Sequence, residues 1–140
     1  MTRPSVPLAL ALLASVGAAA GTVLAAPAAA IVIDPSTPSF GQEVAFSWSG
    51  GGDDVNLTVW CFANATTLPA QPAGTQLLVT GARLAEDGVF TQPAFLTFGP
   101  TSNWTGGGAD CTAQVGVITY SGNSGNYQQK FTSRPFTVSP

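Results

Sequence analysis

From residue 31 onward, apolar and polar residues alternate in short segments, and clusters of Gly, Pro, Asn, Asp and Ser separate one segment from the next. Alternation with a period of two is typical of β-strands that bury one face. No apolar period of helical spacing extends beyond about one turn in this part of the chain. The pattern therefore predicts an all-β domain, either a sandwich or a barrel.

The clearest alternation is in Glu43–Ser49, where Val44, Phe46 and Trp48 fall on one face. We expect a polar turn at Gly81–Gly88. We also expect a bulge at Ser133–Pro135, because proline cannot donate a hydrogen bond to a sheet. The strands that the pattern predicts are Ile31–Asp34, Glu43–Ser49, Val55–Ala63, Gln76–Thr80, Val89–Phe98, Ala109–Tyr120 and Tyr127–Val138. The segment Val89–Phe98 is expected to hold one or two strands.

The first thirty residues differ from the rest of the chain. Arg3 precedes an Ala- and Leu-rich apolar run from Val6 to about Ala26, and small residues continue to Ala30. This is the three-part pattern of a secretory signal peptide, so we predict cleavage near residues 28–30 and one mature domain over 31–140. An uncleaved membrane anchor is the alternative, since the run approaches the roughly 20 residues that span a bilayer. Its Ala and Gly content and the small residues at its end favour cleavage.

Charge excludes several classes of partner. Beyond residue 30 the chain has seven acidic and three basic side chains (Arg83, Lys130 and Arg134), and so a formal net charge of −4. Nucleic-acid binding depends on neutralising phosphates with basic residues, so we expect no nucleic-acid partner. The scarcity of basic residues also argues against binding to anionic membrane surfaces once the signal peptide is removed.

The chain has two cysteines, Cys61 and Cys111, which we expect to form a disulfide in an exported protein. If they lie directly opposite each other in an antiparallel pair, the same register places Val59 opposite Ala113 on the core side. The intervening residues, Trp60 among them, then lie on the outer face. A slip of one residue would exchange the two faces. The disulfide would therefore join two strands of one sheet, whereas the bridge of antibody domains joins the two sheets.

Four segments stand out in chain order: Pro35–Gly41, Leu96–Thr101, Trp104–Ala113 and Phe136–Val138. Together they resemble small secreted bacterial Ig-like domain proteins. The resemblance covers nearly all of the mature chain and implies an Ig-like Greek-key β-sandwich of about seven to nine strands and an extracytoplasmic location, with no shared activity. A weaker resemblance, carried by Cys111–Gly116, is to the apoproteins of the enediyne chromoproteins, which have two disulfides where this chain can form one.

The sequence offers little catalytic chemistry. It contains no histidine, which removes histidine-activated nucleophiles and histidine-ligated zinc. Asp53 and Asp54 are adjacent in a turn and are expected to point apart, while Asp110 is expected at the opposite end of the sheet. We therefore expect no enzyme activity, no cofactor and no metal site, and we interpret these acids as solvated loop residues.

The aromatic residues give the candidate binding surface. Trp48 is expected in the core, and Trp104 is expected to cover one end of the sandwich. Trp60 and Phe62 are predicted on the outer face of their strand, either exposed or covered by a neighbouring loop. Tyr120 is also expected on the outer face, but it follows Thr112, the residue opposite Trp60, by eight residues. It therefore lies about 27 Å from Trp60 and belongs to a separate part of the surface. Exposed aromatic side chains on a sheet stack on sugars or anchor protein partners.

The sequence thus predicts a non-catalytic secreted Ig-like module with a surface-recognition or structural role outside the cell or at the cell envelope. For recognition, the candidate binding surface is Trp60 and Phe62, and the expected partner is a protein or a polysaccharide. The alternative is a carrier that binds a small apolar or aromatic ligand in a cleft of the sandwich, beside the sheet that contains Cys61 and Cys111. Exposure of Trp60 and Phe62 at the surface would favour recognition, and their placement in a deep pocket would favour the carrier.

Overall fold

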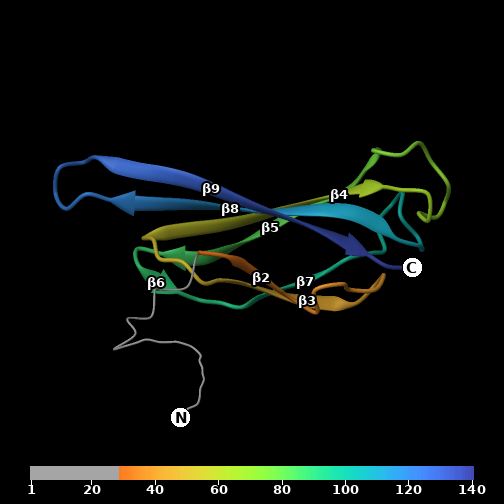
Figure 1. The fold of residues 1–140 in the computed structure, drawn as a ribbon, viewed down its shortest axis with the longest axis horizontal. Coiled ribbons are helices and arrows are strands. Elements are labelled where there is room, and N and C mark those ends of the chain that lie inside the picture. The colour runs from red at the N-terminus through yellow and green to blue at the C-terminus, as the bar shows by residue number, and fades with distance from the viewer. Residues whose placement is uncertain (1–28) are drawn as a thin grey trace, which may run out of the picture.

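The computed structural model describes residues 29–140, which form two antiparallel sheets packed face to face (Figure 1). The predicted signal peptide falls almost wholly on residues 1–28, outside the described residues. Within residues 29–140, no helix is long and apolar enough to cross a membrane. The predicted all-β sandwich is confirmed.

The smaller sheet has the strand order β2-β3-β7, formed by Ile31–Asp34, Glu43–Trp48 and Ala94–Thr97. The larger sheet has the order β6-β5-β4-β8-β9. This arrangement corresponds to that of variable-type Ig domains without one strand of the smaller sheet. The strands of the larger sheet are β4 (Asp54–Ala63), β5 (Gln76–Glu86), β6 (Val89–Phe90), β8 (Ala109–Tyr120) and β9 (Tyr127–Val138).

The predicted register between β4 and β8 is confirmed along its whole length. Cys61 pairs with Cys111, and Val59 pairs with Ala113. The two cysteines form a disulfide, with their Cα atoms 4.1 Å apart. The bond therefore joins neighbouring strands of one sheet, as the sequence predicts, and does not cross the core. Trp60 pairs with Thr112 on the opposite face of the same two strands.

Aromatic contacts between the two sheets fill the centre of the core. Phe46 from β3 packs edge-to-face against Phe98 and Phe136, with ring centroids 5.9 Å away in each case. Phe98 and Phe136 contact each other at 5.5 Å. Because Phe136 belongs to β9, this cluster connects the smaller sheet to the edge strand of the larger one. Edge-to-face pairs of this kind are worth about 0.5–1.5 kcal/mol beyond the area they bury.

The Trp-Thr-Gly-Gly-Gly segment closes one end of the sandwich. Trp104 is fully buried, and its indole N–H donates to the carbonyl oxygen of Gly107. Gly107 has a φ of +73° and lies so close to the backbone of Thr66 that a Cβ could not fit. Thr67 donates its hydroxyl to the carbonyl of Gly108 at 2.6 Å. Packing of loops at this end therefore explains why this segment needs its tryptophan and a glycine at position 107.

The expected turn at Gly81–Gly88 is wrong, because β5 continues through it to Glu86. The polar residues that suggested a turn lie on an exposed strand, where Arg83 and Glu86 form an ion pair of 3.1 Å. A bulge lets consecutive residues Leu84 and Ala85 both face the core. Only Asp87 and Gly88 turn the chain, with positive φ angles of 51° and 79°, as in tight hairpin turns.

The expected bulge at Ser133–Pro135 is also wrong. The register between β8 and β9 is continuous from the pair Ala109–Val138 to the pair Tyr120–Tyr127. Pro135 is tolerated without a bulge because β9 is an edge strand, and a proline nitrogen that faces away from the ladder removes no hydrogen bond.

Replacing both Cys61 and Cys111 by alanine is expected to lower the free energy of unfolding by roughly 4 kcal/mol, the chain-entropy value for a loop of this length. The closed loop spans 50 residues. Urea denaturation of the double variant and of the oxidised and reduced wild type measures the change. The reduced wild type should resemble the variant. Equal midpoints for the variant and the oxidised wild type would contradict the expected contribution.

Candidate functional site

The outer face of the larger sheet carries an apolar surface at the end that contains the disulfide. Trp60 lies on β4 between Val79 of β5 and Thr112 of β8, and Pro135 of β9 follows in the same cross-strand row. Val79 is 48% exposed, and Trp60 and Phe62 are both partly exposed. We call the surface formed by Trp60, Phe62, Val79, Thr112 and Pro135 the outer patch.

The three tryptophans differ in how their indole N–H groups are used. The buried Trp48 donates to the carbonyl of Gly51 at 3.1 Å, and the buried Trp104 donates to that of Gly107 at 3.4 Å. The indole N–H of Trp60 makes no hydrogen bond within residues 29–140, and its side chain remains partly open to solvent. Trp60 therefore combines an apolar ring with a donor that solvent or a bound partner can use.

Phe62 lies beside an open depression of about 440 Å³ on the same face. The depression is lined by side chains or backbone of β4, β8 and β9, including Thr112 and Pro135. Asp110 and Thr137 add polar groups to this lining. The side chain of Asn64 donates to the carboxylate of Asp110 at 3.0 Å and fixes it at the rim. The outer patch thus joins aromatic surface to neighbouring hydrogen-bonding groups.

A separate cleft of about 340 Å³ lies between the sheets at the opposite end of β8. The side chain of Trp48 forms one wall, while Val117 and Thr119 of β8 and Lys130 of β9 contribute to the other. The glycines of the β3–β4 turn complete its lining, together with Ala29, Gln128 and Thr132. Neither Trp60 nor Phe62 lines this cleft, so the two predicted aromatic residues belong to the surface and not to the cleft.

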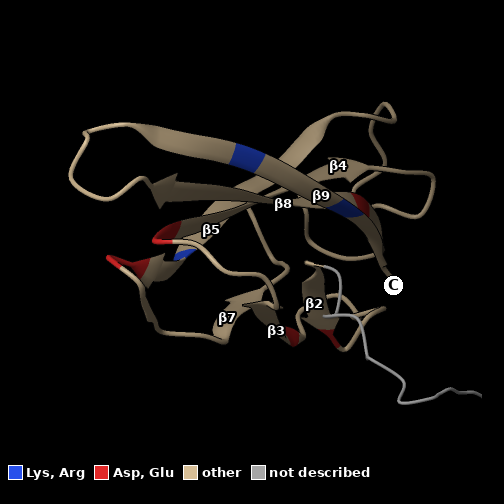
Figure 2. Cartoon of the chain, turned by 60° about the vertical axis from the view of Figure 1, so that its left-hand side comes forward, with Lys and Arg blue, Asp and Glu red and all other residues tan. Residues whose placement is uncertain are grey.

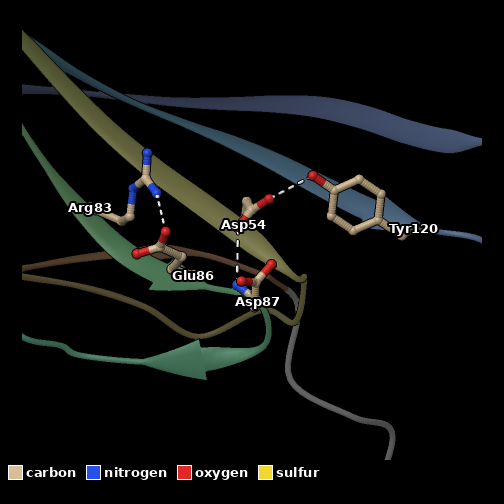
Figure 3. Close-up of polar contacts among 5 residues, drawn as sticks. All are labelled: Asp54, Arg83, Glu86, Asp87 and Tyr120. Carbon is tan, nitrogen blue, oxygen red and sulfur yellow. Dashed lines mark hydrogen bonds and ion pairs between the residues drawn. The ribbon is translucent and has the colours of Figure 1, made fainter. Parts of the chain in front are cut away.

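The acidic residues near Tyr120 tie loops together (Figure 3). Asp54 accepts hydrogen bonds from the backbone N–H of Asp87 at 3.0 Å and from the hydroxyl of Tyr120 at 2.7 Å. Asp53 accepts the backbone N–H of Tyr120 at 2.7 Å. The N–H of Asp87 and the Tyr120 hydroxyl hold the pKa of Asp54 below its ordinary value, and the Asp54 carboxylate raises the pKa of Tyr120. Both acids of the turn are therefore engaged in structural contacts.

Other chemistry-bearing groups are dispersed in the described part of the chain. Asp110 pairs with Phe62 at the disulfide end of the sheet. Asp53 and Asp54 lie at the other end, as the sequence predicts. Both cysteines are bonded to each other. Among residues 29–140, no three His, Cys, Asp or Glu side chains are grouped so as to hold a metal ion. The outer patch and the cleft are candidates for a ligand, and a further depression of about 290 Å³ is lined by Ile118, Tyr120, Tyr127 and Gln129.

Sequence reasoning identified Trp60 and Phe62 but missed Val79 and Pro135, which complete the outer patch. The short strand expected at Gln76–Thr80 contains Val79, but bulges on both sides of the regular stretch that pairs Val79 with Trp60 leave this register without a sequence signal. Pro135 could have been found by extending the disulfide register to the last strand, because it lies directly opposite Thr112. The cleft has no signal in the sequence, because the alternation of Glu43–Ser49 indicates only that Trp48 faces the core.

The Asp54→Asn variant should melt at a lower temperature than the wild type at neutral pH, because the charged form accepts both hydrogen bonds best. A lowered folded-state pKa gives stability that is present above the unfolded value of 3.8 and is lost as pH falls through the folded value. The difference in melting temperature should therefore shrink as pH falls below 3.8. Tyr120→Phe, which leaves the Asp87 N–H in place, should show part of the effect. A difference independent of pH would contradict this assignment.

Comparisons with known proteins give no match: no protein family, no curated protein and no solved structure is detectably similar to the chain. Function is therefore inferred from the surface chemistry of the described residues.

Proposed function

We propose that the protein is a non-catalytic, secreted Ig-like module, of the kind that small secreted bacterial Ig-like proteins represent, and that it recognises a protein or polysaccharide outside the cell or at the cell envelope. The outer patch is the binding surface. Trp60 carries the proposal, because it is a partly exposed tryptophan on a regular sheet whose indole N–H has no partner within residues 29–140.

The chemistry of the outer patch suits surface recognition. Tryptophan is enriched among the residues that contribute most to binding, since its large ring buries much apolar area and its N–H gives direction. Trp60 is held between Val79 and Thr112 on neighbouring strands, so its position is set by the sheet. A ligand that stacks on Trp60 can also reach the polar rim at Asp110 and Thr137.

Location outside the cytoplasm is supported by the disulfide and by the predicted signal peptide. Disulfides persist in oxidising compartments and are rare in reducing ones. The negative net charge supports partners other than nucleic acids and anionic lipids.

The cleft beside Trp48 supports a second candidate function, that of a small-molecule carrier. Its volume of about 340 Å³ is at the lower end of the range for small-ligand sites. Trp48 and Val117 offer apolar surface to an aromatic ring, and the ammonium group of Lys130 offers a positive charge. The cleft therefore suits a small aromatic ligand that bears a negative charge. The outer patch remains the first candidate because the two predicted aromatic residues lie on it.

Trp60→Ala is expected to weaken partner binding by about thirtyfold or more, the loss typical of a central interface tryptophan. Binding to envelope fractions and to a polysaccharide array measures the effect. Phe95→Ala is the matched control, because Phe95 is an aromatic residue 60% exposed on β7 of the other sheet. Equal binding by wild type and Trp60→Ala would remove the outer patch as the site.

The carrier function predicts that small anionic aromatic compounds, such as naphthalene sulfonates, perturb the fluorescence of Trp48. Thr119→Trp should abolish binding by filling the cleft, whereas Trp60→Ala should leave it unchanged, since Trp60 is not part of the lining. Binding that survives Thr119→Trp and is lost in Trp60→Ala would contradict a carrier site at this cleft.

A further inference from the structure

The larger sheet ends in a long strand with one side open. Within residues 29–140, the outermost strands are β2 and β7 of the smaller sheet and β6 and β9 of the larger one. Three of them have four residues or fewer, whereas β9 has 12. Figure 1 shows the β8–β9 hairpin extending past the other strands at one end of the molecule. An edge of this length is a template for pairing with another strand.

Two observations identify the backbone groups that face the open side. The N–H of Ser121 donates to the carbonyl of Asn126, which makes this a hydrogen-bonded pair at the start of the hairpin. Alternation along an antiparallel ladder then directs the N–H and C=O groups of Tyr127, Gln129, Phe131 and Ser133 away from β8. The short Cα–Cα distance of 4.1 Å at the disulfide is that of a non-hydrogen-bonded pair of β4 and β8. The backbone groups of Cys111 therefore point towards β9, where Cys111 pairs with Phe136, and alternate residues from Pro135 back to Tyr127 face outward.

The other half of β9 is protected. The backbone of Pro135 faces outward like that of Ser133, but Pro135 has no N–H to offer a second strand. Proline at such outward positions is typical of edge strands. Arg134 donates its guanidinium to the carbonyl of Ile31 in the smaller sheet at 2.8 Å. Beyond the strand, Ser139 pairs with Ser39 and covers the last part of the edge. The unprotected segment is therefore Tyr127–Ser133.

We propose that this segment pairs with the same segment of a second copy of the protein, antiparallel and about a two-fold axis at Gln129. Gln129 then lies opposite itself, and Tyr127 lies opposite Phe131 of the second copy. These residues all direct their backbone groups outward, so about six backbone hydrogen bonds form. The register ends at the Ser121–Asn126 turn on one side and before Pro135 on the other. The larger sheets of the two copies become one continuous sheet.

The side chains of this segment are self-complementary in that register. Tyr127 and Phe131 are each 61% exposed on the outer face, and Tyr127 contacts Tyr120 edge-to-face at 6.4 Å. Phe131 lies over Gly116, where a Cβ would be 3.1 Å from its ring. Two-fold pairing brings Tyr127 against Phe131 of the second copy, so each exposed ring becomes partly covered. Aromatic cross-strand pairs stabilise antiparallel sheets.

Charge permits this approach of two acidic molecules. β9 carries two basic residues and no acid, seen as the blue bands of Figure 2. On the inner face, the two-fold register places Lys130 opposite Gln128 and not opposite a second lysine. A second copy is therefore favoured over an unrelated strand, because the segment meets itself without a charge clash.

Sedimentation equilibrium of the oxidised protein, expressed from the full sequence, tests the proposal over a wide range of concentrations. The wild type should form a dimer. Gln129→Pro removes an outward N–H from each copy and should weaken the dimer about tenfold or more. Gln129→Ala is the matched control, keeps the N–H and should dimerise like the wild type. Circular dichroism establishes that each variant is folded.

The two-fold register has its own test, because Gln129 opposes only itself. Gln129→Lys and Gln129→Glu should each be monomeric when alone, and an equal mixture should form a heterodimer. A monomeric wild type, a dimer that survives Gln129→Pro, or failure of the mixture to associate would overturn the proposal. Trp60→Ala should leave association unchanged, so this result is independent of the proposed partner binding at the outer patch.

Discussion

The disulfide between Cys61 and Cys111 holds the two central strands of the larger sheet in one register. Side chains alternate along a strand, so a fixed pair at one position decides which residues face the core for the whole length of both strands. Val59 and Ala113 are buried for this reason, and Trp60 is directed outward. A covalent link within one sheet thereby determines which aromatic residue is offered at the surface.

The same register extends to the edge of the sheet through β8. Because Cys111 and Cys61 occupy a non-hydrogen-bonded pair, the backbone groups of Cys111 point towards β9. This orientation places Pro135 where its missing N–H costs nothing, and it leaves alternate residues of the hairpin end, Gln129 among them, facing solvent. The outer patch at one end and the open edge at the other are two consequences of one alternation. They are chemically distinct, since the first is centred on side chains and the second on the backbone.

The regular part of this fold could be predicted from the sequence, because β3, β4 and β8 bury one face and their apolar residues alternate accordingly. β5 could not, since its bulge places Leu84 and Ala85 in the core in succession and its Gly81 and charged residues imitate a turn. Trp60 and Phe62 followed from the disulfide register. Val79 lies opposite Trp60 in a regular stretch of pairing with a bulge on each side. The cleft beside Trp48 needs residues from three distant segments. Neither has a local sequence signal.

Nuclear Overhauser contacts between Hα protons of β4 and β8 test the central register most directly. In non-hydrogen-bonded antiparallel pairs the Cα atoms are about 4.5 Å apart, so their Hα protons give strong signals. The register predicts strong Hα–Hα contacts between Val59 and Ala113 and between Leu57 and Val115. A contact between the Hα protons of Trp60 and Ala113 would instead indicate a shift of one residue, which would turn Trp60 into the core and contradict the account.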